Sequence, residues 1–263
     1  MEREARKREQ TATSILSCIG GSEHRWQILS LLGEGEYEVR QIESELDVPR
    51  TTLRHNIKKM EERGLVEETP KRKYRLTPLG RATQEGLETY HSYVSTTLHL
   101  DPLFSCISYE SFEGNIGSLR DANLTVASSV RPHAPSQRFF ELISEATRTI
   151  GLLTSLPLTE DQFRTVLSDE QSRLELLFTE EIARVFEEEF SFLDENGGES
   201  PETSFWTVDR DAEFTLAVVD ETVVILALDG RDKPHVLVET DNDACRSWAM
   251  QEFETYRESA TPY

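Results

Sequence analysis

The chain has 263 residues, a modest hydrophobic fraction of 37% and a formal net charge of −21. It is long enough for two domains, and it lacks any run of about 20 apolar residues of the kind that spans a bilayer. Its first ten residues lack the apolar core of a secretory signal peptide. We therefore expect a cytoplasmic protein without a membrane segment.

The negative charge is confined to the second part of the chain. Residues 1–98 contain 16 basic and 16 acidic side chains, whereas residues 99–263 contain 12 basic and 33 acidic ones. A large negative charge argues against a polyanionic partner, because phosphate contacts require cations. The neutral first part is free of that objection.

Cys18, Cys106 and Cys245 are far apart and form no C-x-x-C pair, so we predict no disulfide, metal site or cofactor.

Two short helical patterns lie in the neutral part. Residues 25–32 form a dense apolar stretch that suits a helix packed into a small core, and glycines follow it. A second helix, of about two to three turns, has Ile42 and Leu46 on one face. A turn at residues 47–49 ends it, and Pro49 suits the start of the next helix because its missing N–H needs no partner there.

The third helix has one apolar face and one cationic face. The apolar positions are Leu53, Ile57 and Met60, and the cationic ones, every four residues, are Arg50, Arg54 and Lys58. Gly64 follows the last turn, where a residue with positive φ usually closes a helix. Two short strands, at residues 65–68 and 74–77, then flank a basic hairpin tip at residues 69–73. This succession predicts a winged helix-turn-helix.

A recognition helix reads base edges in the major groove with its first turns, and basic loops hold phosphate. Basic helical faces are often only solvated surface, but here a basic hairpin follows the third helix, which favours DNA as the partner. His55 either contacts DNA or points to solvent. The predicted base-facing residues are Arg50, Thr51, Thr52 and Arg54, and the predicted backbone contacts are Lys58, Lys59, Lys71, Arg72, Lys73 and Arg75.

Three segments are predicted: a DNA-binding domain at 1–77, a linker or dimerisation helix at 78–98 and an α/β effector-sensing domain at 99–263. Apolar residues recur at helical spacing through the middle segment. That helix either pairs with its mate in a homodimer or packs on its own domain. Residues 1–20, which contain Ile15, Leu16 and Ile19, either add to the same interface or are disordered.

Helix and strand patterns alternate beyond residue 98, and the strand, helix and strand over residues 123–154 indicate a β-α-β unit, which predicts a sheet covered by helices. The expected strands are 123–129, 149–154, 173–178, 204–208, 214–219, 223–228 and 235–239, with a hairpin at 220–222. The expected helices are 136–148, 162–167, 180–193 and 243–257, with an exposed loop at 195–201. The fold class is thus α/β, or α+β overall.

Only six lysines stand against 22 arginines, beside 49 acidic residues. This composition resembles cytoplasmic proteins of salt-accumulating halophilic archaea, and the resemblance implies that the acidity serves solubility in high salt.

Three runs in the second part resemble the effector domains of archaeal winged-helix regulators. They are R-F-F-E-L-I-S-E-A-T-R-T-I-G-L-L-T, E-F-T-L-A-V-V-D-E-T-V-V-I-L-A-L-D-G and W-A-M-Q-E-F-E-T-Y-R-E-S-A-T-P. The similarity is to the methanogenesis-regulator family and, more distantly, to the phospholipase-D-like sensor domain of TrmB-like sugar regulators. It implies a homodimeric transcription regulator whose C-terminal domain senses an unidentified small-molecule effector.

Catalysis of the phospholipase-D type needs a histidine nucleophile with a lysine two residues further on. None of the six histidines is followed by lysine at that offset, so no catalytic residue is predicted and the chain is not expected to be an enzyme. We expect a sequence-specific DNA-binding regulator. The alternatives are a protein-interaction module, since winged helices also bind proteins, and a sequence-independent, chromatin-like DNA-binding protein.

Overall fold

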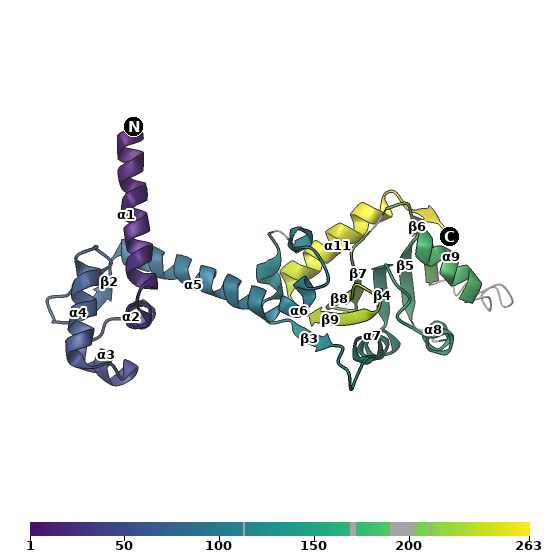
Figure 1. Ribbon diagram of the computed structural model, residues 1–263, viewed down its shortest axis with the longest axis horizontal. Coiled ribbons are helices and arrows are strands. Elements are labelled where there is room, and N and C mark those ends of the chain that lie inside the picture. Colours follow the sequence, from purple (N-terminus) through teal and green to yellow (C-terminus); the bar gives the residue numbers. More distant parts are fainter. Residues whose placement is uncertain (113, 169–171, 190–202, 211) are drawn as a thin grey trace. The chain divides into compact units, whose positions relative to one another are not determined.

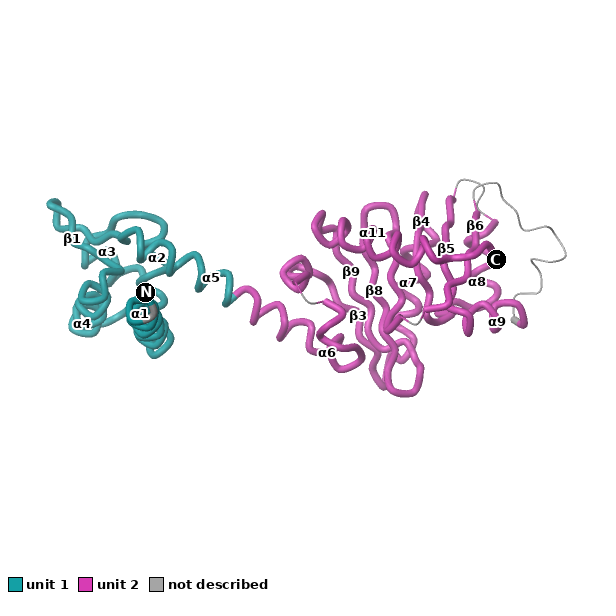
Figure 2. The backbone as a smooth tube through the Cα atoms, turned by 90° about the horizontal axis from the view of Figure 1, so that it is seen from above, with its two compact units in different colours: residues 1–91 teal, residues 92–263 magenta. Residues whose placement is uncertain are grey.

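The computed structural model describes residues 1–112, 114–168, 172–189, 203–210 and 212–263. The chain divides into two compact units, residues 1–91 and 92–263, which are coloured separately in Figure 2. The division falls inside the segment predicted as a linker, which is a single helix, α5 (Pro78–His99). None of the helices within the described ranges is long and apolar enough to cross a bilayer.

The N-terminal unit is the predicted winged helix-turn-helix. Before α5 its elements are α1 (Glu2–Gly20), α2 (Glu23–Glu34), α3 (Val39–Leu46), α4 (Arg50–Glu61), β1 (Val66–Glu68) and β2 (Tyr74–Leu76) (Figure 1). Asp47 takes a left-handed φ of 49° that ends α3 and turns the chain toward α4. Apolar side chains from α1 to α4 and from both strands form one core, with Leu29, Ile42 and Ile57 at its centre.

The first helix resolves one of the alternatives left open by the sequence. Residues 1–20 are helical over nearly their whole length rather than disordered. Ile15 and Ile19 are buried in the N-terminal core, so the end of α1 is part of the winged-helix unit. Leu16, by contrast, is 54% exposed.

The start of α5 is fixed against the wing by a close approach of two backbones. Thr77 Oγ1 donates a hydrogen bond to the Gly64 carbonyl at 2.5 Å, and the Thr77 amide donates to the Leu65 carbonyl at 3.0 Å. Gly80 lies so close to the residue before β1 that a Cβ atom on Gly80 would be 1.9 Å from the Leu65 carbonyl oxygen. Only glycine fits at position 80.

The C-terminal unit is a mixed α/β domain built on an eight-stranded sheet. The strands are β3 (Asn123–Val126), β4 (Arg148–Leu153), β5 (Arg173–Thr179), β6 (Thr203–Val208), β7 (Thr215–Val219), β8 (Thr222–Leu228), β9 (Pro234–Thr240) and β10 (Thr261–Pro262). Their order across the sheet is β10-β6-β5-β4-β7-β8-β9-β3. Strands β4, β5 and β6 run parallel to one another, and the other neighbours are antiparallel.

Helices cover both faces of this sheet, so it has two cores. One face packs against α7 (Ala134–Ser144), α8 (Glu160–Leu167) and α9 (Glu180–Glu189). The other packs against α11 (Asp243–Arg257) and the short helices α6 (Asp101–Phe104), η1 (Tyr109–Phe112) and η2 (Ile116–Leu119). The strands between these layers are buried on both sides, which explains their continuous apolar runs.

Several expectations for the second part need correction. The helix expected over residues 136–148 ends at Ser144, because the Asp220 carboxylate accepts the amide N–H of Arg148 at 2.9 Å and draws it into β4. Strand β3 is not beside β4, as a simple β-α-β unit would require; it pairs with β9 at the sheet edge. Strand β10 and the helices α6, η1 and η2 were not predicted. The helix expected over 180–193 begins at Glu180 as predicted; its last residues, 190–193, and the loop expected over 195–201 lie outside the described residues.

The contact at Gly80 yields a stability prediction. Replacing Gly80 with Ala should destabilise the N-terminal unit by about 2–3 kcal/mol or more, because the backbone of Leu65 has to move. Gly86→Ala, on the same helix with nothing near its Cβ position, should instead stabilise by about 0.5–1 kcal/mol. Denaturant unfolding of both variants is the measurement, and similar unfolding midpoints for the two would contradict the described contact.

Candidate nucleic-acid interface

Helix α4 is built as a two-sided element. Leu53, Ile57 and Met60 point into the core and are almost wholly inaccessible to solvent. The predicted DNA-binding residues on the other side differ in exposure. Arg50, Thr51, Arg54, His55 and Lys58 are exposed, whereas Thr52 and Lys59 are half-buried. The burial of one face therefore fixes which side chains α4 presents to a partner.

A buried polar contact joins α4 to the helices behind it. Asn56 is buried although it lies on the cationic helix, and its side-chain oxygen accepts a hydrogen bond from Arg25 Nη1 at 3.3 Å. Arg25 is also buried, and its Nε donates to the Cys18 carbonyl at 2.5 Å. Sequence reasoning missed this contact, because neither residue interrupts an apolar pattern.

The wing is a short, well-defined hairpin. Val66 pairs with Leu76 and Glu68 with Tyr74, and the Thr69 amide donates to the Lys73 carbonyl at 2.7 Å to close the tip. Arg72 stands at the turn with a φ of 56°. Of the predicted tip cations, Lys71 and Arg72 are exposed and Lys73 is half-buried.

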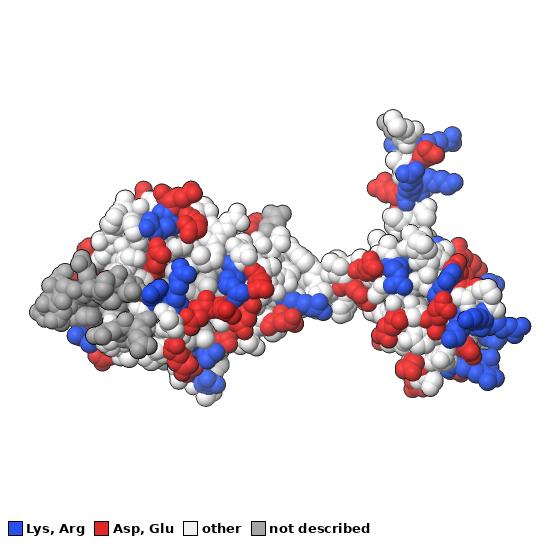
Figure 3. Space-filling model, turned by 180° about the vertical axis from the view of Figure 1, so that it is seen from behind, with Lys and Arg blue, Asp and Glu red and all other residues white. Residues whose placement is uncertain are grey.

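An open groove of about 560 Å³ lies between α3, α4 and the wing. Its cationic lining residues are Arg40, Arg50, Arg54, Lys58 and Arg72, and its acidic ones are Glu38, Glu61 and Glu68. Arg40, on the first turn of α3, was not among the predicted residues, because the prediction considered the cations of α4 and the wing alone. Figure 3 shows Lys and Arg side chains gathered over part of this unit.

The remaining predicted residues do not line this groove. They are Thr51, Thr52, His55, Lys59, Lys71, Lys73 and Arg75. Arg75 lies on β2 and is paired with two carboxylates, Glu67 at 2.8 Å and Glu36 at 3.6 Å. Its charge is therefore already neutralised within the wing.

Comparison with known families agrees with this two-part architecture. Residues 132–259 match the family model described as methanogenesis regulatory protein FilR1, middle domain. Residues 15–99 match a second model, the HVO_A0261 N-terminal domain, and the two matches do not overlap. Over residues 132–259 the chain is thus similar to the middle domain of a methanogenesis regulator, and its N-terminal unit has the winged helix-turn-helix fold. No curated protein matches it significantly in sequence.

Solved structures show only distant likenesses. The archaeal chromatin protein TrmBL2, whose structure is described as showing a novel mode of DNA binding, is 13% identical, with 92% of this chain and 94% of that chain covered and a TM-score of 0.43. NucT from Helicobacter pylori is 15% identical over 54% of this chain and 99% of its own, with a TM-score of 0.44. The phospholipase D family member Nuc from Salmonella typhimurium is 11% identical over 54% and 99%, with a TM-score of 0.43. Because these TM-scores are all below 0.5, the three likenesses support no conclusion about the function of this chain.

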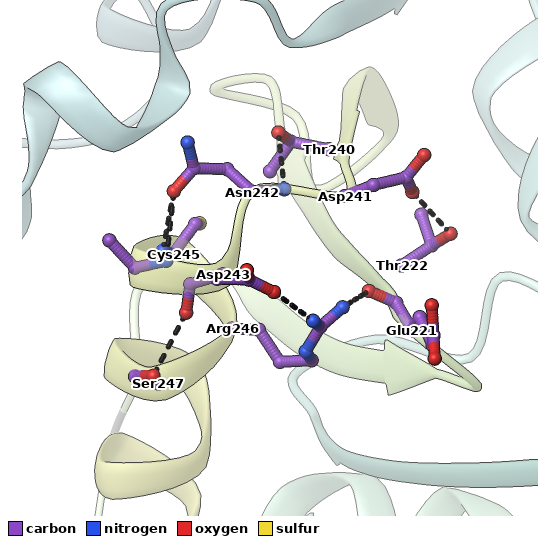
Figure 4. A network of polar contacts seen from close by, with 10 residues as sticks. Glu221, Thr222, Thr240, Asp241, Asn242, Asp243, Cys245, Arg246 and Ser247 are labelled. Carbon is purple, nitrogen blue, oxygen red and sulfur yellow. Dashed lines mark hydrogen bonds and ion pairs between the residues drawn. The ribbon is translucent and has the colours of Figure 1, made fainter.

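The C-terminal unit has a polar pocket of its own, about 440 Å³ in volume. Beside it, Figure 4 shows a network at the start of α11 in which Thr222 Oγ1 donates to Asp241 at 2.7 Å and Arg246 bonds both Asp243 and the Glu221 carbonyl. Asn242 caps α11 by accepting two amide N–H groups. Among the residues that the structure describes, no three acidic, histidine or cysteine side chains could hold a metal ion.

The ionised form of Glu61, one of the acidic residues of the N-terminal groove, is destabilised by its surroundings. Partial burial and, secondarily, the nearby Glu68 carboxylate raise the pKa of Glu61 above its ordinary value of 4.5. The pKa of Tyr74 is raised by burial and by Glu61 and Glu68, with Arg54 acting against the shift. Two carboxylates therefore repel each other at the end of a groove that is otherwise rich in cations.

Replacing Glu61 with Gln should stabilise the N-terminal unit at neutral pH. Because the folded state holds the Glu61 proton more tightly than the unfolded chain, ionised Glu61 destabilises the fold above its raised pKa and costs nothing below pH 4.5. The gain should therefore be present at pH 7 and vanish near pH 4 in urea unfolding. Glu62→Gln, an exposed neighbour with the same charge change, is the control. An equal effect of both variants would assign the gain to overall charge.

Proposed function

We propose that this regulator binds double-stranded DNA in a sequence-specific manner and controls transcription. The observation that carries the proposal is the groove whose cations come from α3, α4 and the wing together. A helix with this exposure fits the major groove, where its first turns read base edges while a basic hairpin contacts phosphate. Since the partner is DNA, we infer a cytoplasmic location.

The residues divide into two proposed roles. Arg50, Thr51, Thr52, Arg54 and His55 face bases or adjacent phosphate, and Lys58, Lys59, Lys71, Arg72, Lys73 and Arg75 hold the backbone. Arg40 joins the second group because it lines the same groove. Arg75 contributes least, since Glu67 and Glu36 already neutralise it.

Two variants separate base reading from phosphate binding. Arg54→Ala should cost about 1–3 kcal/mol of operator affinity and relax the sequence preference. Replacing Lys71, Arg72 and Lys73 together with Ala should weaken binding to all sequences alike and reduce the salt slope by about 0.9 for each lost contact. Fluorescence anisotropy at several salt concentrations, with an operator selected from random DNA and a scrambled copy, measures both.

The control removes two exposed cations from a turn of the C-terminal unit, as Arg231→Ala with Lys233→Ala, and should leave binding unchanged. Unaltered binding by both test variants would show the DNA interface to be wrong. Equal affinity for selected and scrambled DNA would indicate a chromatin-like binder, and absence of DNA binding would leave a protein-interaction module.

We further propose that α5 pairs two copies of the chain. Leu79, Tyr90, Val94 and Leu98 share one face of α5, and Tyr90 and Leu98 are 67% and 71% exposed. Leu87 and His91 lie on or beside this face of α5 and are held by their own unit, since Leu87 packs against the core and the His91 ring lies 5.5 Å from that of Trp26, so the continuous exposed part of the stripe begins at Tyr90. Pairing of the exposed stripe would bury it and present two recognition helices to a palindromic operator.

Charge placed on the stripe should separate the copies. Tyr90→Glu with Leu98→Glu should halve the mass in solution, from twice 30.1 kDa to a single 30.1 kDa chain, as measured by light scattering after size exclusion. Ser95→Glu adds charge to an exposed position of the same helix outside the stripe and should leave the dimer intact. A wild-type protein that is already monomeric would refute the pairing.

The C-terminal unit is the proposed sensor. Its polar pocket falls within the roughly 300–1,000 Å³ typical of small-molecule sites, which supports binding of an as yet unidentified effector that modulates operator binding. The acidic excess of residues 99–263 favours solubility at high salt, the proposed working condition.

A further inference from the structure

The first half of α1 extends beyond the core of its unit (Figure 1). From residue 3 to residue 14 every side chain is exposed, and burial begins only at Ile15. The match to the N-terminal family model begins at the same place, residue 15. This projecting segment, residues 3–14, which we call the arm, is thus an addition to the matched domain.

The arm concentrates positive charge in a chain that is strongly acidic overall. Four cations, Arg3, Arg6, Lys7 and Arg8, lie within six residues, and Figure 3 shows blue side chains, with red ones among them, along the N-terminal part of this helix and uncharged ones toward its base. Arg3, Arg6 and Lys7 are spaced by three and four residues, which places them on one helical face. Within the described part of the chain, no ion pair joins these cations to a carboxylate.

A helix of this length without packing is only marginally stable in water. Binding to an oppositely charged partner would therefore stabilise the helical conformation of the arm. Two polyanionic surfaces are available in principle: DNA, and the acidic C-terminal unit of this chain, which holds 33 of the 49 acidic residues.

The attachment of the arm favours DNA. Arg25 bonds the Cys18 carbonyl near the end of α1 and also Asn56 on α4, so a buried guanidinium ties α1 to the recognition helix. Figures 1 and 2 both draw the base of α1 beside α4. When α4 enters the major groove, the arm is therefore carried to the same DNA.

We propose that the arm is a second DNA-contacting element, in which Arg3, Arg6 and Lys7 bind backbone phosphates flanking the base pairs that α4 reads. This inference rests on the proposed function. Twelve helical residues reach roughly 18 Å, which corresponds to about five base pairs along the duplex. The contact is to phosphate alone, so it lengthens the bound site without adding sequence preference.

The test removes the three charges and keeps the helix. Arg3→Gln, Arg6→Gln and Lys7→Gln together should lower affinity at least about tenfold for an operator with about eight flanking base pairs on each side, and lower its salt slope by about 2.7 for each bound chain. Affinity for the core operator without flanks should stay the same. Glutamine preserves helix propensity, which circular dichroism checks.

Glu4→Gln with Glu9→Gln is the matched control, because it changes charge on the same arm away from the cationic face and should leave binding equal or tighter. Unchanged affinity and slope on the flanked operator would overturn the arm contact, while a loss of binding in Arg54→Ala would still uphold the proposed function. Tighter DNA binding by the arm variant would also overturn it, and would show that the arm is held by the acidic unit. If Arg54→Ala binds normally as well, the proposed function itself fails.

Discussion

Burial of one side of α4 is the constraint on which the N-terminal interface depends. Leu53, Ile57 and Met60 leave water together, and the helical repeat then forces the residues between them outward. The orientation of Arg54 is thus a consequence of core packing rather than of any contact that Arg54 makes. Gly80 in turn lets the start of α5 approach the Leu65 backbone, just before the first strand of the wing.

The local parts of the structure followed from the sequence, and the long-range parts did not. Helices α2 to α4 and the wing have short-range signals: apolar spacing, a proline before α4 and glycine after it. The sheet order has no such signal, because β4 pairs with β7 about 70 residues away and β3 with β9 about 110 residues away. Continuous apolar runs identify buried strands but carry no information about their neighbours.

The interface shows the same limit at the level of single residues. The cationic positions of α4 were readable because their four-residue spacing is local. Arg40 enters the groove through the packing of α3 on α4, and Arg75, besides its partner Glu67 across the hairpin, pairs with Glu36, nearly forty residues earlier. Neither relation has a sequence pattern. Asn56 is similar: its burial depends on Arg25, which comes from another helix.

The short final strand has a consequence for how the molecule avoids unwanted association. β10 is only two residues long and covers β6 at one edge of the sheet, and its last residue, Pro262, has no N–H to offer a further strand. The opposite edge is the four-residue β3. Such short edge strands offer few free backbone groups to a strand of another molecule and so limit edge-to-edge aggregation. This matters in a protein whose central strands are long runs of valine and leucine.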